Sequence, residues 1–273
     1  MKLSTFTTIT DPIRRGDCVS PAMQCYADLS DEVIIIDGLA ANGKPTHIPD
    51  YTGKLTAVEN EWLREFSWEF IGKQFQRGYE ACTGDWVIHA DLDFIFHERD
   101  FGKIKQALRD YPNSPAVSFY KWQFILPDRY NLKSRLPLAV NKKVFGDRIK
   151  FNGGGDLCQP TLDGEDMDLN EIPQAGVPFY NYEKLIKTKE QIIDDVERMD
   201  RAYERRFGKK LYSTGGKTAY EGWYHMVKGR FNKPQAKIRL EDHPKYAQET
   251  IKNLTPDQFG YNGFGLIERK VYA

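Results

Sequence analysis

The chain lacks long hydrophobic runs and paired cysteines. No apolar stretch in the 273 residues approaches the ~20 residues that a membrane-spanning helix needs. The first ten residues are too short and too polar a stretch to predict a signal peptide. The four cysteines form no CxxC pair and do not cluster with histidines, which argues against a zinc site and against a disulfide framework. We therefore expect a soluble protein in a reducing, cytoplasmic compartment.

The chain also lacks an excess of charge of either sign, with 39 basic and 39 acidic residues. The distribution is nevertheless uneven. Residues 121–150 carry eight basic against two acidic residues, a net of +6, and residues 201–240 carry eleven against two, a net of +9. Aromatic residues are interleaved with the second stretch. Basic residues mixed with aromatics can hold phosphates and stack on bases, although ordinary solvated surface gives the same pattern.

Internal repeats, low-complexity segments and a glycine-rich phosphate loop are all absent from the sequence. Gly153 to Gly155 lack the preceding strand and the following Lys-Ser/Thr of such a loop. What is present is an alternation of strands and helices. The pattern predicts strands at 3–10, 32–36 and 86–90 and a helix at 20–29. This order predicts an α/β fold with a mostly parallel sheet flanked by helices.

The length favours one α/β core with an appended region. We expect the core, with the ligand-binding and catalytic residues, in residues 1–180. We expect a helical, loop-rich and basic extension in residues 181–273, packed on the side of the core where a second substrate would bind, with a long charged helix at 183–207.

The most informative segment is Asp91-Leu92-Asp93, which directly follows the apolar strand at 86–90. Ligands of open α/β sheets bind beyond the carboxyl ends of the strands. Two carboxylates at that place would suit Mg²⁺ or Mn²⁺, which would in turn hold a diphosphate. Taken alone, the tripeptide fits a solvated turn better than a metal site, because aspartate is common at strand ends.

The order of three segments resembles the family-2 glycosyltransferases, which have the GT-A fold. The strand ending in Ile36-Asp37-Gly38 is similar to an apolar strand of that family that ends in aspartate. The passage from Gln76 to Asp93 is similar to its helix, Gly-Asp turn and strand ending in Asp-x-Asp. Gly164-Glu165-Asp166 resembles its later Glu-Asp motif. The resemblance covers residues 3–170, and one departure is Gln76, where the family usually has asparagine.

The resemblance implies a role for each matching residue. Asp91 and Asp93 would hold Mn²⁺ or Mg²⁺, with Asp91 also near the donor's ribose. Asp166, or else Glu165, would be the general base that deprotonates the acceptor hydroxyl, unless the two belong to a solvated acidic loop. The remaining predicted donor-binding residues are Asp37 and Asp11 for the nucleoside, and Lys73 and Arg77 for the diphosphate.

A third metal ligand is harder to place. The segment Pro178 to Tyr182 stands where some relatives have a strand containing histidine, but it has none. His89, His225 and His243 are the candidates, and His243 is the preferred one. For each of them a structural role is the alternative.

The resemblance therefore implies an inverting, metal-dependent hexosyltransferase that uses a nucleotide-diphosphate sugar, with UDP as the favoured nucleotide. The acceptor is open: it is either an anionic molecule, such as DNA bearing a hydroxymethylated base, or a glycan, lipid or protein. A nucleotidyltransferase is the alternative enzyme, although residues 10–16 match its basic loop only in part. A binding module for nucleotide-sugars is the alternative without catalysis.

Overall fold

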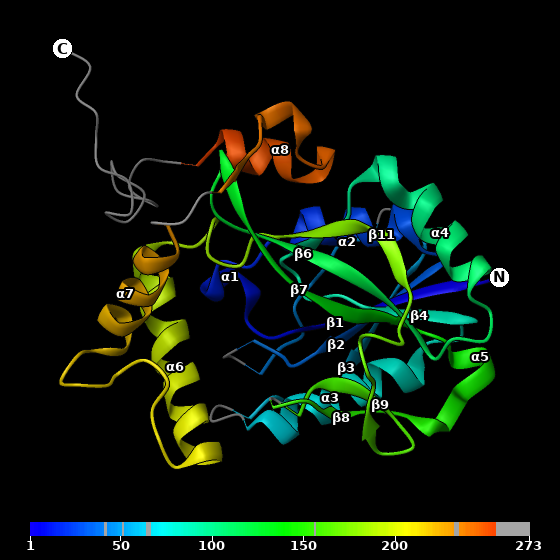
Figure 1. Cartoon of the computed structure of the whole chain (residues 1–273), viewed down its shortest axis with the longest axis horizontal. Helices are drawn as coiled ribbons and strands as arrows, with labels where there is room; N and C mark the ends of the chain where they lie inside the picture. The colour runs from blue at the N-terminus through cyan, green and yellow to red at the C-terminus, as the bar shows by residue number, and fades with distance from the viewer. Residues whose placement is uncertain (41–42, 51, 64–66, 156, 232–234, 255–273) are drawn as a thin grey trace.

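The computed structural model describes residues 1–254 except 41–42, 51, 64–66, 156 and 232–234. The last part of the predicted extension, 255–273, therefore lies outside the described residues, as does Asp156. One large curled sheet forms the centre of the molecule, and helices lie on both of its faces (Figure 1). This confirms the α/β class.

Half of the sheet is parallel. Its strands lie in the order β3-β2-β1-β4, and all neighbours in this half run in the same direction. The strands are β1 (Leu3–Ile9), β2 (Glu32–Asp37), β3 (Leu55–Glu59) and β4 (Trp86–His89). The predicted strands match β1, β2 and β4. The strand β3 was not among the predicted strands, because most of its side chains are exposed and carry no hydrophobic signal.

The other half is mixed, with the order β7-β6-β11-β5 beyond β4. Here β7 runs antiparallel to both β4 and β6, whereas β11 runs parallel to β6. The strands are β5 (Phe94–Ile95), β6 (Ala116–Leu126), β7 (Arg129–Val140) and β11 (Gln174–Asn181), with β12 (Ala236–Lys237) beside β7. The sheet is thus parallel from β3 to β4 and mixed from β4 to β5.

Two hydrophobic layers cover the sheet. Alternation along β1 directs Leu3 and Ile9 to one layer and Phe6 to the other. Helices α2 (Val19–Leu29), α4 (Phe101–Asp110) and α8 (Lys245–Lys252) pack in the first layer. Helix α3 (Trp68–Ala81) packs in the second, together with a small antiparallel sheet of β8 (Ile149–Gly153), β9 (Gln159–Leu162) and β10 (Glu165–Asp166). Gly78 lets α3 approach β1, since a Cβ there would lie 2.4 Å from Phe6.

The region after residue 181 forms a helical hairpin and rejoins the sheet. Helix α6 (Lys189–Phe207) begins at a capping box between Thr188 and Gln191, six residues later than the predicted 183. It packs against α7 (Ala219–Phe231), and β12 then pairs with β7. The short elements are α1 (Pro12–Arg15), α5 (Lys142–Phe145), η1 (Glu98–Asp100), η2 (Gly146–Arg148) and η3 (Leu240–Asp242). None of the described helices combines the length and apolar composition needed to cross a bilayer.

Candidate active site

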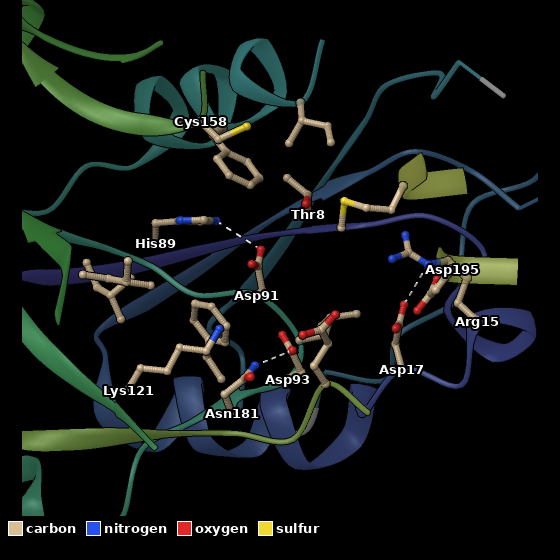
Figure 2. A pocket seen from close by; sticks show the side chains of 18 of the residues that line it. Thr8, Arg15, Asp17, His89, Asp91, Asp93, Lys121, Cys158, Asn181 and Asp195 are labelled. Atoms are coloured by element: carbon tan, nitrogen blue, oxygen red, sulfur yellow. Dashed lines mark hydrogen bonds and ion pairs between the residues drawn. The ribbon is translucent and has the colours of Figure 1, made fainter. Parts of the chain in front are cut away.

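A cavity of about 500 Å³ opens where several central strands end. Thr8, His89 and Asn181 line it from the ends of β1, β4 and β11, and Asp91 and Asp93 line it from the loop after β4 (Figure 2). Open α/β sheets bind ligands at this edge. The structure thus brings Thr8 and Asn181, which lie 173 positions apart along the chain, to the Asp91-Leu92-Asp93 segment.

The loop that carries Asp91 and Asp93 is held by two buried tyrosines. The Tyr26 hydroxyl on α2 donates to the carbonyls of Asp91 and Phe94, at 2.5 and 2.9 Å. The Tyr182 amide donates to the carbonyl of Asp93 at 2.9 Å. The Asp91 and Asp93 side chains are therefore presented on a fixed backbone and need little reorganisation to bind a ligand.

Three side chains supply oxygen atoms at this place. Asn181 Nδ2 donates to Asp93 Oδ2 at 2.5 Å, and Asn181 Oδ1 is buried without a hydrogen-bond partner among the described residues. Burial, together with the carboxylates of Asp91 and Glu183, raises the pKa of Asp93 to about 7. Crowded carboxylates beside an unpaired amide oxygen form a site that a divalent cation would stabilise.

The donor set fits Mg²⁺ or Mn²⁺, which prefer hard oxygen ligands. The described residues contain no cluster of three or more His, Cys, Asp or Glu placed to hold a metal, so a third protein ligand has to be of another kind. The unpartnered Asn181 amide oxygen could serve as such a ligand. Asn181 ends β11, within the Pro178–Tyr182 segment in which some relatives have a histidine.

His89 lies beside Asp91. Its Nε2 is 3.3 Å from Asp91 Oδ1, and its ring packs against Phe75 and Phe6 at centroid distances of 3.9 and 4.9 Å. The ring is held in an aromatic layer, and its buried Nε2 makes no hydrogen bond with the described residues. Packing therefore fixes the ring at the edge of the cavity, next to the carboxylate.

The side of the cavity that carries Arg15 in Figure 2 is formed by an ion-pair network. Lys187 Nζ lies 3.1 Å from Asp17 and 2.6 Å from Asp195, and Asp195 also pairs with Lys184 and Arg198. Arg15 pairs with Asp17 at 3.5 Å. Glu183 also pairs with Lys184, so four cations face three carboxylates and this wall keeps a small net positive charge, which suits a phosphate.

Glu183 lies between this wall and the Asp91–Asp93 loop. Its carboxylate pairs with Lys184 at 2.8 Å, and about a third of its side chain is exposed. Burial acts to raise the pKa of Glu183, but Lys184 and Lys121 outweigh it and hold the pKa below its usual value. The cavity thus contains an ionised carboxylate besides the aspartate pair.

Aromatic side chains line another part of the cavity. Trp62 and Trp68 come from the segment leading into α3 and from its first turn, and Phe75 from the next turns. Indole rings are suited to stacking on a nucleobase. Beside the positive wall, they give the cavity the two surfaces that a nucleoside diphosphate requires.

The predicted general bases lie elsewhere. Glu165 and Asp166 form β10 at the edge of the small sheet, where both are exposed, and neither lines the cavity. Asp166 Oδ1 instead accepts a hydrogen bond from the Gly154 amide at 2.8 Å. The sequence motif was read as a catalytic loop, whereas its residues form the return strand of a hairpin. The structure therefore does not bring Glu165 and Asp166 together with Asp91 and Asp93.

The predicted nucleoside ligands have structural roles. Asp37 is fully buried, and its two oxygens accept the amides of Leu39 and Thr46 at 2.9 and 2.6 Å. It therefore organises the loop after β2 and is not open to a nucleobase. Asp11 precedes α1 with φ of 45° and pairs with Arg14 at 2.9 Å, outside the cavity lining. Both predictions are corrected.

Lys73 and Arg77 are exposed on α3, whereas the face of that helix that lines the cavity carries Trp68, Ile71 and Phe75. Helical spacing directs the two cations to solvent. The cations in the cavity are instead Arg15, Lys121, Lys184, Lys187 and Arg198. Lys73 and Arg77 are therefore surface residues that the structure does not place in the cavity.

His243 is a core residue. It is fully buried, its Nδ1 shares a hydrogen bond with the Tyr182 hydroxyl at 2.8 Å, and its Nε2 lies 2.8 Å from the Pro127 carbonyl. With both nitrogens occupied it has no lone pair to give a metal, so its prediction as the third ligand is wrong. His225 is exposed on α7 and does not line the cavity.

His243→Ala is expected to lower the free energy of unfolding by about 2–4 kcal/mol, because it leaves a cavity and an unpaired Tyr182 hydroxyl. Denaturant unfolding measures this loss.

Burial lowers the pKa of His243 below its ordinary 6.5. Its stabilising effect is therefore fully present above pH 6.5 and is lost as the pH falls below that value, so the variant should show a shallower loss of stability on acidification. Loss of Mn²⁺ binding by the folded His243→Ala variant would contradict this structural role.

The two basic stretches differ in the structure. In residues 121–150 most cations are used internally: Arg129, Lys143 and Arg148 pair with neighbouring aspartates, and Arg135 and Lys142 donate to backbone carbonyls. This stretch forms no continuous basic surface. In residues 201–240 many cations are exposed along the second half of α6, the following loop and α7. The predicted anion-binding surface is therefore confined to the helical hairpin and to Lys121 and Lys133.

Comparison with known proteins identifies no family. No family model and no curated protein matches the chain. Among solved structures, it is similar to S. aureus TarS 1–349, at 12% identity and a TM-score of 0.44 over 85% of this chain and 80% of that one. It is also similar to the 4-diphosphocytidyl-2C-methyl-D-erythritol synthase of Anaerococcus prevotii, at 17% identity and 0.40, over 75% and 99%. Likenesses this low establish neither a family nor an activity.

Asn181 and Glu183 were missed at the sequence level, although a signal was present. Asn181-Tyr182-Glu183 ends an apolar strand in the same way as Asp91-Leu92-Asp93, with two polar residues separated by one large apolar residue. Because only histidine was considered as a ligand in this strand, Asn181 and Glu183 were not predicted. Its position next to Asp93 depends on β11 pairing with β5, which is not visible in the sequence.

Proposed function

We propose that the chain is a metal-dependent glycosyltransferase that moves a sugar from a nucleotide-diphosphate donor, with UDP favoured, to an acceptor hydroxyl. The observation that carries the proposal is the cavity in which Asp91, Asp93 and Asn181 Oδ1 face a net-positive wall and two indole rings. A nucleotide-sugar needs all three surfaces: a cation site, a phosphate site and a stacking platform.

Each part of the cavity would have one task. Asp91, Asp93 and Asn181 would hold Mn²⁺ or Mg²⁺, which when bound supplies Lewis-acid neutralisation of the departing diphosphate. Arg15 and Lys187 would bind the phosphates from the opposite side. Trp62 and Trp68 would stack on the base. Tyr26 and His89 would keep the loop and Asp91 in place.

Glu183 would be the general base in place of Glu165 and Asp166. In the proposed step the acceptor oxygen attacks the anomeric carbon and the carbon–oxygen bond to the diphosphate breaks. The diphosphate leaves with the bonding electrons, and the acceptor proton passes to the Glu183 carboxylate. One displacement of this kind inverts the anomeric centre. Glu183 is suited to it because its partly exposed carboxylate lines the same cavity as Asp91 and Asp93.

A thermal-shift screen of nucleotide-sugars with and without Mn²⁺ tests the donor assignment. A bound donor at 100 times its Kd stabilises the protein by about 2.7 kcal/mol, which is readily detected. We expect one UDP-sugar to raise the melting temperature only when Mn²⁺ is present. Stabilisation that is equal with Mn²⁺ and with a chelator would contradict the metal site.

A nucleotidyltransferase is the second candidate, because Arg15 follows β1 closely and lines the cavity. The two reactions differ in their leaving group. A glycosyltransferase releases a nucleoside diphosphate, whereas a nucleotidyltransferase releases pyrophosphate from a nucleoside triphosphate. Release of UDP from the stabilising donor supports the first, and release of pyrophosphate supports the second. Donor binding with neither product would indicate a binding module without catalysis.

A further inference from the structure

The end of helix α6 and the loop that follows it form a positively charged tip of the helical hairpin. Residues 201–217, called the hairpin tip from here on, contain six basic residues and one acidic residue, a net charge of +5. The rest of the chain has 33 basic and 38 acidic residues, a net charge of −5. The neutral molecule therefore has a positive end. Its exposed cations are Arg201, Arg205, Arg206, Lys209, Lys210 and Lys217.

The helix dipole explains only part of this charge. Arg205 and Arg206 lie in the last turn of α6, where the dipole favours cations. Lys209, Lys210 and Lys217 follow the helix, and the effect of the dipole is confined to the last turn. Arg206, Lys209 and Lys210 form no ion pair with another described residue. Like charges gathered in this way repel one another, and an anionic partner would relieve the repulsion.

Apolar side chains are exposed among these cations. Phe207 is 40% exposed and Leu211 is 39% exposed. The Phe207 ring packs on Tyr203 at a centroid distance of 4.4 Å, and the Arg206 guanidinium lies 5.4 Å from the centre of the same ring. Apolar side chains flanked by cations are typical of segments that lie in the headgroup layer of an anionic membrane. There the cations meet lipid phosphates while the apolar groups leave water.

The hairpin tip projects from the molecule and does not form a groove around its cations. Figure 1 shows the end of α6 and the loop after it at the periphery, away from the central sheet. Arg206, Phe207, Lys209 and Lys210 line neither the active-site cavity nor a smaller cavity beside α7. Proteins that bind single-stranded nucleic acids without sequence preference hold the strand in a positive groove with stacked aromatics. A projecting tip that exposes the aliphatic Leu211 is better suited to a bilayer surface.

We propose that the hairpin tip docks the protein on membranes that contain anionic lipids. Lys209 and Lys210 would contact the headgroup phosphates, and Phe207 and Leu211 would lie between the headgroups. Met199 is the last residue of α6 that lines the active-site cavity, and it lies about 12 Å along the helix from Phe207, at 1.5 Å per residue. Docking would therefore hold the candidate active site close to the bilayer surface. This inference does not depend on the proposed glycosyl transfer.

Sedimentation of the full chain with vesicles tests the docking. We expect binding to vesicles of phosphatidylcholine with about 30% phosphatidylglycerol, weaker binding as salt rises, and no binding to phosphatidylcholine alone. A basic residue near an anionic surface contributes a factor of about five, so Lys209→Ala/Lys210→Ala should weaken binding about 25-fold. Lys73→Ala/Arg77→Ala removes two exposed cations from α3 and is the matched control, with an expected change of less than twofold.

A second double variant separates the apolar contact from the charge. Phe207→Ser/Leu211→Ser should weaken vesicle binding about tenfold and keep the salt dependence of the wild type, because it removes apolar area and no charge. Melting temperatures of all variants exclude unfolding as the cause of weak binding.

Three results would overturn the docking proposal. The first is equal vesicle binding by the wild type and Lys209→Ala/Lys210→Ala, and the second is an equal loss in the α3 control. The third is tighter binding to a single-stranded oligonucleotide than to anionic vesicles, unchanged in Phe207→Ser/Leu211→Ser, which would make the tip a nucleic-acid surface. None of these results bears on the donor assignment, which the nucleotide-sugar screen tests separately.

Discussion

Asp93→Ala is expected to abolish Mn²⁺-dependent binding of the donor and to lower kcat/KM for donor hydrolysis or transfer by about a thousandfold. The reason is the position of the carboxylate beside Asp91 and Asn181 Oδ1, where a divalent cation would neutralise the departing diphosphate. Loss of several kcal/mol of charge stabilisation corresponds to a rate loss of this size, at about 1.4 kcal/mol for each factor of ten. Isothermal titration with Mn²⁺ and a UDP-release assay measure the two effects.

Asp166→Ala is the matched control, because it removes an aspartate that lies on the exposed hairpin. We expect this variant to keep Mn²⁺-dependent donor stabilisation. Asn181→Ala should lie between the two variants, with metal affinity lowered about 10- to 100-fold, the usual cost of losing a supporting metal-site residue. Loss of metal binding in Asp166→Ala and its retention in Asp93→Ala would reverse the assignment.

Glu183→Gln is expected to slow sugar transfer by about 10²- to 10⁴-fold, the usual contribution of a general base, while the donor still binds. The amide has nearly the shape of the carboxylate but cannot take the acceptor proton. Steady-state kinetics with saturating donor should show the loss in kcat, with little change in KM for the donor. Donor affinity is measured separately by thermal shift.

Two further variants separate catalysis from stability, because Glu183 also pairs with the buried Lys184. Glu183→Asp keeps the charge and should retain more activity than Glu183→Gln. Glu165→Gln makes the same chemical change on the exposed β10 and should leave kcat unchanged. If Glu165→Gln is inactive and Glu183→Gln retains activity, the base belongs to the motif that the sequence favoured.

The sequence predicted the α/β class and the parallel half of the sheet because local patterns determine them. The Val-Ile-Ile-Ile run of β2 and the strand before Asp91 are buried on both faces, and such runs are visible without tertiary information. For the same reason the place of Asp91 and Asp93 at a strand end was predictable. The later start of α6 was not predicted, since the capping box at Thr188 was overlooked in a uniformly charged region.

Asp37 and His243 have structural roles for one physical reason. Both were chosen by residue type and order, but burial and hydrogen bonding decide whether such a group is open to a ligand. The Asp37 oxygens are taken by two backbone amides, and the His243 nitrogens by Tyr182 and Pro127. A buried polar group needs such partners, and it then has no capacity left for a substrate.

By itself, the sequence determined that two carboxylates follow a buried strand of an α/β sheet, because strand periodicity and turn chemistry are local properties. The tertiary structure decided which groups join them. Asn181, Glu183 and Lys121 reach the cavity only through the pairing of β11 with β5 and β6, and Lys187 and Arg15 only through the contact between α1 and α6. Such neighbours lie tens to hundreds of residues apart, and only the packing of the sheet and helices brings them together.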